Sequence, residues 1–195
     1  KYVLGVNTLQ MNRDHDYAAG RANQLRTLEH LGVFIVPKFT NASSRITKPT
    51  TGPKGPVYPP EDFGARFLKP PEEMPRLPNP YDASVALEPR VRSYLHANCA
   101  HCHTDAGGGN SAMELRWFTL PAMVRLVGVP PQHDKFGLTD GLLVAPGAPE
   151  RSILLQRLLR VGTGGMPPLA KARVDASAIS LFSDWIRQLP PQPTP

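Results

Sequence analysis

Proline is the residue that most constrains how this chain can fold, because it fixes φ and has no backbone N–H to donate. The chain contains 23 prolines among 195 residues, and 11 of them lie in residues 37–80, in stretches such as "KPTTGPKGPVYPPEDF" and "LKPPEEMPRLPNP". This density excludes both a helix interior and a sheet. We therefore expect residues 37–80 to form an extended linker or arm, with sparse apolar residues that could hold it on a neighbouring surface. Those residues are Phe63, Phe67 and Leu68.

The residues before this arm, 1–36, show the pattern of an ordered segment. The stretch "YVLGVNTLQM" is typical of a short strand or extended segment. After it, apolar residues recur at helical spacing, and Gly32 suits the position that ends a helix. The recurring residues are Ala22, Leu25, Leu28 and Leu31. The chain opens directly on "KYVLGVNTLQ", which looks like the middle of a longer sequence, so we expect a fragment and a remnant of a preceding domain.

The residues after the arm, 81–195, carry three helical patterns. They are "EPRVRSYLHANC", "PERSILLQRLLRVG" and "VDASAISLFSDWIRQLPP". In the third, Asp175 suits the N-cap, an apolar stripe follows, and Pro190 stops the helix. Three helices joined by loops predict a small all-α domain.

The charge distribution limits the possible partners. The net charge of +6 divides into +4 for residues 1–80 and +2 for residues 81–195, since these hold 11 basic against 7 acidic and 11 basic against 9 acidic residues. Without a basic cluster, a nucleic-acid partner is not expected. The excess charge suits solubility or weak steering toward an acidic redox partner. No run reaches the roughly 18 apolar residues of a membrane span.

The stretch "NCAHCHTDAGGGNS" holds both cysteines of the chain. Cys99, Cys102 and His103 form a C-x-x-C-H pattern, which is typical of covalent attachment of a c-type haem. This spacing puts two thiols about one helical turn apart, where they could reach two vinyl groups, while the next residue presents its imidazole to the iron. Three other interpretations remain open: a zinc site completed by histidines, a redox-active dithiol and a strained disulfide.

The second axial ligand should lie downstream, on a loop that covers the other haem face. Met166 in "GTGGMPPL" is the favoured candidate, because glycines allow close approach of the backbone and prolines stiffen the presentation of the thioether. Met113, Met123 and His133 are the alternatives, and Met166 could also merely fill a gap in the core. Met11 and Met74 fall outside the haem domain.

Several other polar residues have weaker claims to a role. His101, between the cysteines, is expected to be exposed, and His96 to lie at the surface or on the propionate side. His15 in "NRDHDY" could be a ligand or an acid–base group, but a solvated helix start is the better interpretation. Arg116 and Trp117 have the donors that would suit haem propionates.

The stretches "YLHANCAHCH", "LVAPGAPERSILLQRL", "GGMPPL" and "LFSDWIRQL" together resemble class I cytochrome c domains over residues 84–190. The resemblance implies that the helix before the motif crosses the C-terminal helix, through residues such as Tyr94 and Trp185. His103 and Met166 match the family's axial ligands. One departure is that the family commonly has a proline soon after the motif to fix the proximal histidine, whereas here the first one is Pro121.

The whole chain, through "VLGVNTLQMNRDHDYAAGRANQLRTLEHLGVF", also resembles the C-terminal part of bacterial multidomain and dihaem cytochrome c proteins, notably those of planctomycetes. In some of those proteins another C-x-x-C-H motif lies just upstream, and a β-propeller similar to sugar dehydrogenases is fused or encoded alongside. The resemblance implies that residues 1–36 once packed against an upstream haem site and that this chain keeps one covalent haem.

From these residues we expect a one-electron carrier with one haem c bound through Cys99, Cys102, His103 and Met166. We expect no enzymatic activity of its own and a redox protein, such as a dehydrogenase domain, as its partner. Because haem is attached to this motif outside the bacterial cytoplasm, the expected location is periplasmic or extracytoplasmic. The alternatives are a peroxidase-like haem enzyme with an open distal position and a module that docks the haem domain onto a dehydrogenase through residues 37–80.

Overall fold

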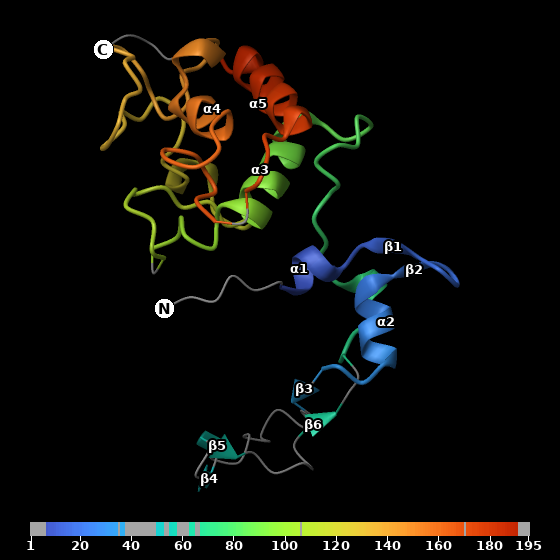
Figure 1. Cartoon of the computed structure of the whole chain (residues 1–195). Coiled ribbons are helices and arrows are strands. Elements are labelled where there is room, and N and C mark those ends of the chain that lie inside the picture. Colours follow the sequence, from blue (N-terminus) through green and yellow to red (C-terminus); the bar gives the residue numbers. More distant parts are fainter. Residues whose placement is uncertain are drawn as a thin grey trace. The chain divides into compact units, whose positions relative to one another are not determined.

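The computed structural model divides the chain into two compact units, one within residues 6–77 and one within residues 78–195 (Figure 1). It describes residues 7–34, 36–37, 50–52, 55–57, 63–64, 67–105, 107–169 and 171–190. Between residues 36 and 64, only the backbone is described. The sequence-based division placed its boundaries after residues 36 and 80. The first unit combines the N-terminal segment from residue 6 onward with the proline-rich arm as far as residue 77.

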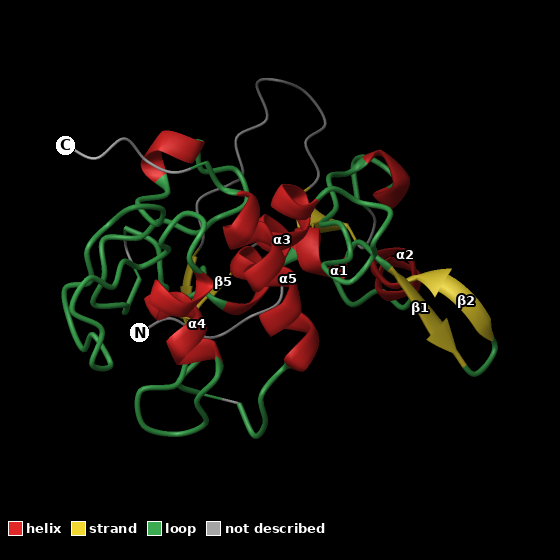
Figure 2. Ribbon diagram, turned by 90° about the horizontal axis from the view of Figure 1, so that it is seen from above, coloured by secondary structure: helices red, strands yellow, loops and turns green. Residues whose placement is uncertain are grey.

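The first unit begins with a short helix and a hairpin. Helix α1 (Thr8–Met11) starts at Asn7, which forms a capping box with Gln10. Strands β1 (Asp14–Tyr17) and β2 (Gly20–Asn23) then pair antiparallel, as Figure 2 shows. We expected an extended segment at "YVLGVNTLQM", but its described residues are mainly helical; residues 2–6 lie outside the described part of the chain.

Helix α2 (Gln24–His30) is shorter than the apolar spacing predicts. It begins only at Gln24, because Asn23 accepts a hydrogen bond from the backbone N–H of Arg26 and caps the helix. Leu25 is fully buried, whereas Leu31 is 68% exposed. The predicted end at Gly32 is confirmed: its φ is 67°, and the N–H of Gly32 donates to the carbonyl of Glu29.

The prediction that prolines exclude sheet from the arm is wrong for its described residues. Strand β3 (Val36–Pro37) pairs with β6 (Phe63–Gly64), and β4 (Thr50–Gly52) pairs with β5 (Gly55–Val57). These ladders have two strands of two or three residues each, so a proline can occupy an edge position where no N–H is required. The remaining arm residues before 67, which are 38–49, 53–54, 58–62 and 65–66, lie outside the described part of the chain.

The last part of the arm packs against α2. The ring of Phe67 lies 4.7 Å from that of Phe34, and the backbone N–H of Phe67 donates to the Glu29 carboxylate at 2.7 Å. Phe67 thus holds the arm on a neighbouring surface, as predicted. Leu68 does not, because it is 67% exposed. The side chain of Phe63 lies outside the described part of the chain. Beyond them, residues Pro71–Glu73 form a 3-10 turn.

The carbonyls of this turn converge on a buried asparagine. The Nδ2 atom of Asn12 lies 2.7 Å from the carbonyl oxygen of Pro71, 2.9 Å from that of Met74 and 3.2 Å from that of Pro75. Asn12 is only 1% exposed, and its Oδ1 accepts a bond from Asn23. One side chain therefore ties the end of the arm to the start of α2.

The second unit contains the three predicted helices: α3 (Leu87–Asn98), α4 (Ile153–Leu158) and α5 (Ala176–Gln188). Helix α4 ends at Leu158 rather than at the predicted Gly162. Short 3-10 turns occur at Pro121–Met123 and Pro149–Arg151. Within the described residues of this unit, the β-structure consists of two isolated bridges, Val127 with Val144 and Leu142 with Ser152.

Helices α3 and α5 lie side by side and form the centre of the core (Figure 1). The Tyr94 and Phe182 rings meet edge to face at 5.4 Å, and Phe182 meets Trp185 in the same way at 6.2 Å. The indole N–H of Trp185 donates to the carboxylate of Glu88 at 2.5 Å. The predicted N-cap of α5 is confirmed, because Asp175 accepts from the backbone N–H of Ala178. In the described part of the chain, no helix is both long and apolar enough to cross a membrane.

Candidate functional site

The cysteine motif continues directly from the end of α3. Cys99 is the C-cap residue, and its N–H donates to the carbonyl of Leu95. The carbonyl of Cys99 then accepts from the N–H of Cys102 at 3.1 Å and from that of His103 at 2.9 Å. These bonds fold the motif into one further turn. The backbone of Cys99, Cys102 and His103 thus lies within one helical turn.

Both cysteine thiols are free. Burial, with a smaller effect of the neighbouring Cys102, raises the pKa of the Cys99 thiol to about 12. Within the described residues, no three His, Cys, Asp or Glu side chains gather at one point in the way that a zinc site requires.

One ring nitrogen of His103, Nδ1, is buried and has no hydrogen-bond partner among the residues that the structure describes. Burial, followed by the positive charge of Arg157, lowers the pKa of the imidazole, so the neutral form that binds metals is favoured. An unpartnered buried polar atom is costly.

The loop after the motif closes over this imidazole. The N–H of Gly109 donates to the carbonyl of Cys102 at 2.9 Å. A Cβ atom at position 109 would lie only 2.9 Å from Nδ1 of His103, so a larger residue would collide with the ring.

Met166 is held against the end of α4. Its backbone N–H donates to the carbonyl of Arg157 at 3.1 Å. The preceding residue, Gly165, is buried, and a Cβ atom there would lie 2.5 Å from the carbonyl oxygen of Arg160. Gly165 therefore allows the loop of "GTGGMPPL" to pack on the helix end, whereas the predicted approach of these glycines to a porphyrin stays a prediction. Arg157 borders both predicted ligands, because its carbonyl binds Met166 and its charge acts on His103.

Lys171, which the sequence did not indicate as a functional residue, connects this loop to the end of α4. The Nζ atom of Lys171 lies 2.6 Å from the carbonyl oxygen of Leu158, 3.0 Å from that of Met166 and 3.3 Å from that of Arg157. A lysine shortly after a helix end is a known signal for carbonyl capping, but nothing local indicates that it would reach three carbonyls.

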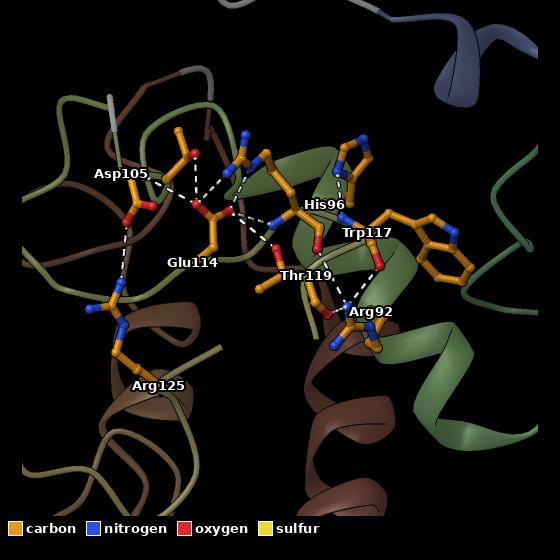
Figure 3. A network of polar contacts seen from close by, with 9 residues as sticks. Arg92, His96, Asp105, Glu114, Trp117, Thr119 and Arg125 are labelled. Carbon is orange, nitrogen blue, oxygen red and sulfur yellow. Dashed lines mark hydrogen bonds and ion pairs between the residues drawn. The ribbon is translucent and has the colours of Figure 1, made fainter. Parts of the chain in front are cut away.

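A second residue missed by the sequence analysis is Glu114, at the centre of a polar network (Figure 3). Its carboxylate is 4% exposed. It accepts hydrogen bonds from the hydroxyls of Thr104 and Thr119, the backbone N–H groups of Asp105 and Arg116, and the Arg116 guanidinium. Bonding to Arg116 is the largest of the effects that lower the pKa of Glu114 to about 2.

This network fixes the chain immediately after His103. Glu114 binds the next two residues, Thr104 and Asp105, and the N–H of Leu115 donates to the carbonyl of His103 at 2.9 Å. Arg92 on α3 donates to the carbonyls of Trp117 and Thr119. The guanidinium of Arg116 forms an ion pair with Glu114, and its expected contact with a haem propionate stays a prediction. The indole of Trp117 is half-buried, and its backbone N–H donates to His96.

The remaining candidates lie as follows. His96 is only 8% exposed and is therefore buried rather than at the surface. Its Nδ1 accepts a hydrogen bond from the backbone N–H of Trp117. His101 is half-buried rather than exposed, with Nε2 3.0 Å from the carbonyl oxygen of Ala97. His133 is exposed, 2.7 Å from the carbonyl oxygen of Asn110. Met113 packs against the core, and Met123 is 55% exposed.

His15 lies on strand β1 and not at a helix start. It is exposed, as expected, and its ring contacts that of Tyr17 edge to face at 4.6 Å. Met11 and Met74 both belong to the first unit.

A cavity of about 420 Å³ opens beside α3, but it does not contain the predicted site. Its walls come from α3, from residues 115–129 and from the end of α5. Cys99, Cys102, His103 and Met166 do not line it. It therefore provides no argument for placing the haem there.

The residues of the candidate site fit a covalently attached haem in two respects. The motif forms one turn after α3, and two free thiols are followed directly by a half-buried imidazole. Comparison of the chain with models of protein families, with curated proteins and with solved structures finds no match. The functional interpretation therefore depends on the residues of the chain itself.

Proposed function

We propose that this protein is a one-electron carrier with one haem c bound through Cys99 and Cys102, and with His103 and Met166 as axial ligands. The observation that carries the proposal is the single turn after α3 that holds two free thiols, Cys99 and Cys102, with the half-buried imidazole of His103 directly after them. A bound haem would supply an iron that alternates between Fe(II) and Fe(III), and methionine ligation would raise its potential.

The chain's own groups have three tasks in this proposal. The turn after α3 positions the thiols and the imidazole, and the Glu114 network fixes the backbone that follows His103. The end of α4 holds the Met166 backbone through the carbonyl of Arg157. With both axial positions filled, no substrate would reach the iron, so the protein would pass electrons to and from a redox partner, in a periplasmic or extracytoplasmic location.

The testing experiment is an absorption spectrum of the full chain, made with c-type maturation machinery, in the oxidised and the dithionite-reduced state. Sharp α and β bands are expected after reduction, with a weak far-red methionine–iron band in the oxidised protein. Met166→Ala should abolish the far-red band, because it removes the thioether. Met123→Ala is the matched control and should keep the band, because Met123 is largely exposed.

Two outcomes would contradict the proposal. An oxidised spectrum that is high-spin and shifts with added cyanide or peroxide would mean an open distal position and would favour a peroxidase-like enzyme. Absence of covalent haem, with intact Cys99 and Cys102, would remove the electron-carrier function altogether.

A further inference from the structure

We infer that Lys171 is a positioning residue for Met166: its ammonium fixes the loop that presents the thioether. This inference deepens the proposed function and rests on it, because Met166 must be a ligand for its position to matter. Three contacts of the Lys171 side chain support it.

The Lys171 ammonium has three N–H donors, and three backbone carbonyls surround it. They belong to Leu158 at 2.6 Å, Met166 at 3.0 Å and Arg157 at 3.3 Å. The side chain is half-buried, and this burial lowers its pKa. Within the described residues, no ion pair joins Lys171 to a carboxylate. Its contacts are with backbone dipoles and not with a counter-charge at the surface.

These carbonyls come from two different segments. Arg157 and Leu158 stand at the end of α4, where helix carbonyls lack intrahelical partners and a cation is favourable. Met166 lies in the loop. The same peptide segment is also held at its other side, because the N–H of Met166 donates to the carbonyl of Arg157. Both polar groups of the Met166 backbone are thus connected to one helix end.

The consequence concerns the strength of thioether binding. A methionine is flexible and binds iron weakly compared with a nitrogen ligand, so its loop must be held for the bond to persist. Without Lys171, the N–H bond to Arg157 would remain, but the carbonyl of Met166 and the end of α4 would lose a charged donor. The loop would then move away from the iron more readily, and external ligands would compete better for the sixth position.

The experiment compares Lys171→Leu with Lys135→Leu in the full haem-loaded chain. Leucine has no ligating atom, so it cannot replace Met166 itself. Lys135 is exposed, so its substitution removes the same charge without these contacts. The measurement is the affinity of the oxidised protein for imidazole, with the far-red band recorded in parallel. Lys171→Leu should bind imidazole about tenfold more tightly and show a weaker band, as the loss of one charged hydrogen bond predicts.

A conservative variant separates positioning from general stability. Lys171→Arg keeps the cation and its donors, and it should recover part of the wild-type resistance to imidazole. If Lys171→Leu lowers the melting temperature but leaves imidazole affinity and the band at the Lys135→Leu values, the role is structural only and the inference is overturned. If Lys171→Leu yields no folded protein, Lys171→Gln, which keeps an amide donor, is measured in the same way.

Failure of the proposed function would look different. If the wild-type protein lacks the far-red band, Met166 is not a ligand and the proposed ligation fails, whatever the lysine variants do. If the wild-type band is present and both leucine variants match it, the ligation stands and only the inference about Lys171 is wrong.

Discussion

At the scale of single residues, Glu114 connects the chain after His103 to the rest of its loop. Its carboxylate is buried and accepts six hydrogen bonds, including two from the Arg116 guanidinium. These donors favour the charged form and hold its pKa at about 2, below the ordinary value of 4.5. Since the folded-state pKa is lowered, the stabilisation is present above about pH 4.5 and is lost as the pH falls toward 2.

Glu114→Gln should therefore lower the free energy of unfolding by about 1–2 kcal/mol at pH 7, after allowance for solvent around the exposed side of Arg116. Urea unfolding at pH 7, 4.5 and 3 checks this, and the difference from the wild type should shrink toward pH 3. Glu150→Gln, at an exposed position, is the control and should have little effect. A difference that stays constant from pH 7 to pH 3 would mean that the charge of Glu114 contributes nothing.

At the scale of elements, the pairing of α3 with α5 carries the core of the second unit. Phe182 is fully buried and contacts both Tyr94 and Trp185. Phe182→Ala should cost about 3–5 kcal/mol, because it removes a ring and leaves a cavity between the helices. Phe118→Ala is the matched control, since Phe118 is 69% exposed and should lose less than about 0.5 kcal/mol. Thermal unfolding of both variants measures how much stability each one loses. Equal losses of stability would contradict the assignment of Phe182 to the core.

At the scale of the whole molecule, each unit has its own set of stabilising contacts. The hydrogen bonds of Asn12 all lie within residues 6–77. Asn12→Ala leaves buried carbonyls without a donor and should destabilise this unit by about 2 kcal/mol. Hydrogen exchange should show lost protection in α2 and residues 67–77, and unchanged protection in α3 and α5. Asn79→Ala, at an exposed position, is the control. Equal loss of protection in both units would contradict their separate stabilisation.

The sequence predicts those parts of the fold and of the candidate site that depend on contacts between residues close together along the chain. Helix α5 follows from local signals, namely the Asp175 cap, the apolar stripe and the stop at Pro190. The hairpin before α2 was missed because "AAGRAN" carries alanines at helical spacing, although Gly20 and the capping Asn23 were available as signals. The C-x-x-C-H turn is likewise local.

The polar contacts that hold the site are not local in this sense. Asn12 reaches carbonyls about sixty residues away, at Pro71, Met74 and Pro75. Lys171 bridges a helix end and a loop, and Glu114 gathers donors from both sides of the 106–113 segment. A charged residue in sequence indicates a solvated surface by default, and only the folded backbone reveals which of them are enclosed by partners.

The glycine loop over His103 has a consequence for how this sequence can change through evolution. Gly108 and Gly109 are neighbours of the same type, but a Cβ atom at 108 would meet open space, whereas one at 109 would meet the His103 ring at 2.9 Å. Among descendants of this chain that keep His103 in this position, residue 108 can change to other residue types, while residue 109 stays glycine. A library that randomises both positions and is sorted for haem content should recover this asymmetry, with many residues at 108 and one at 109.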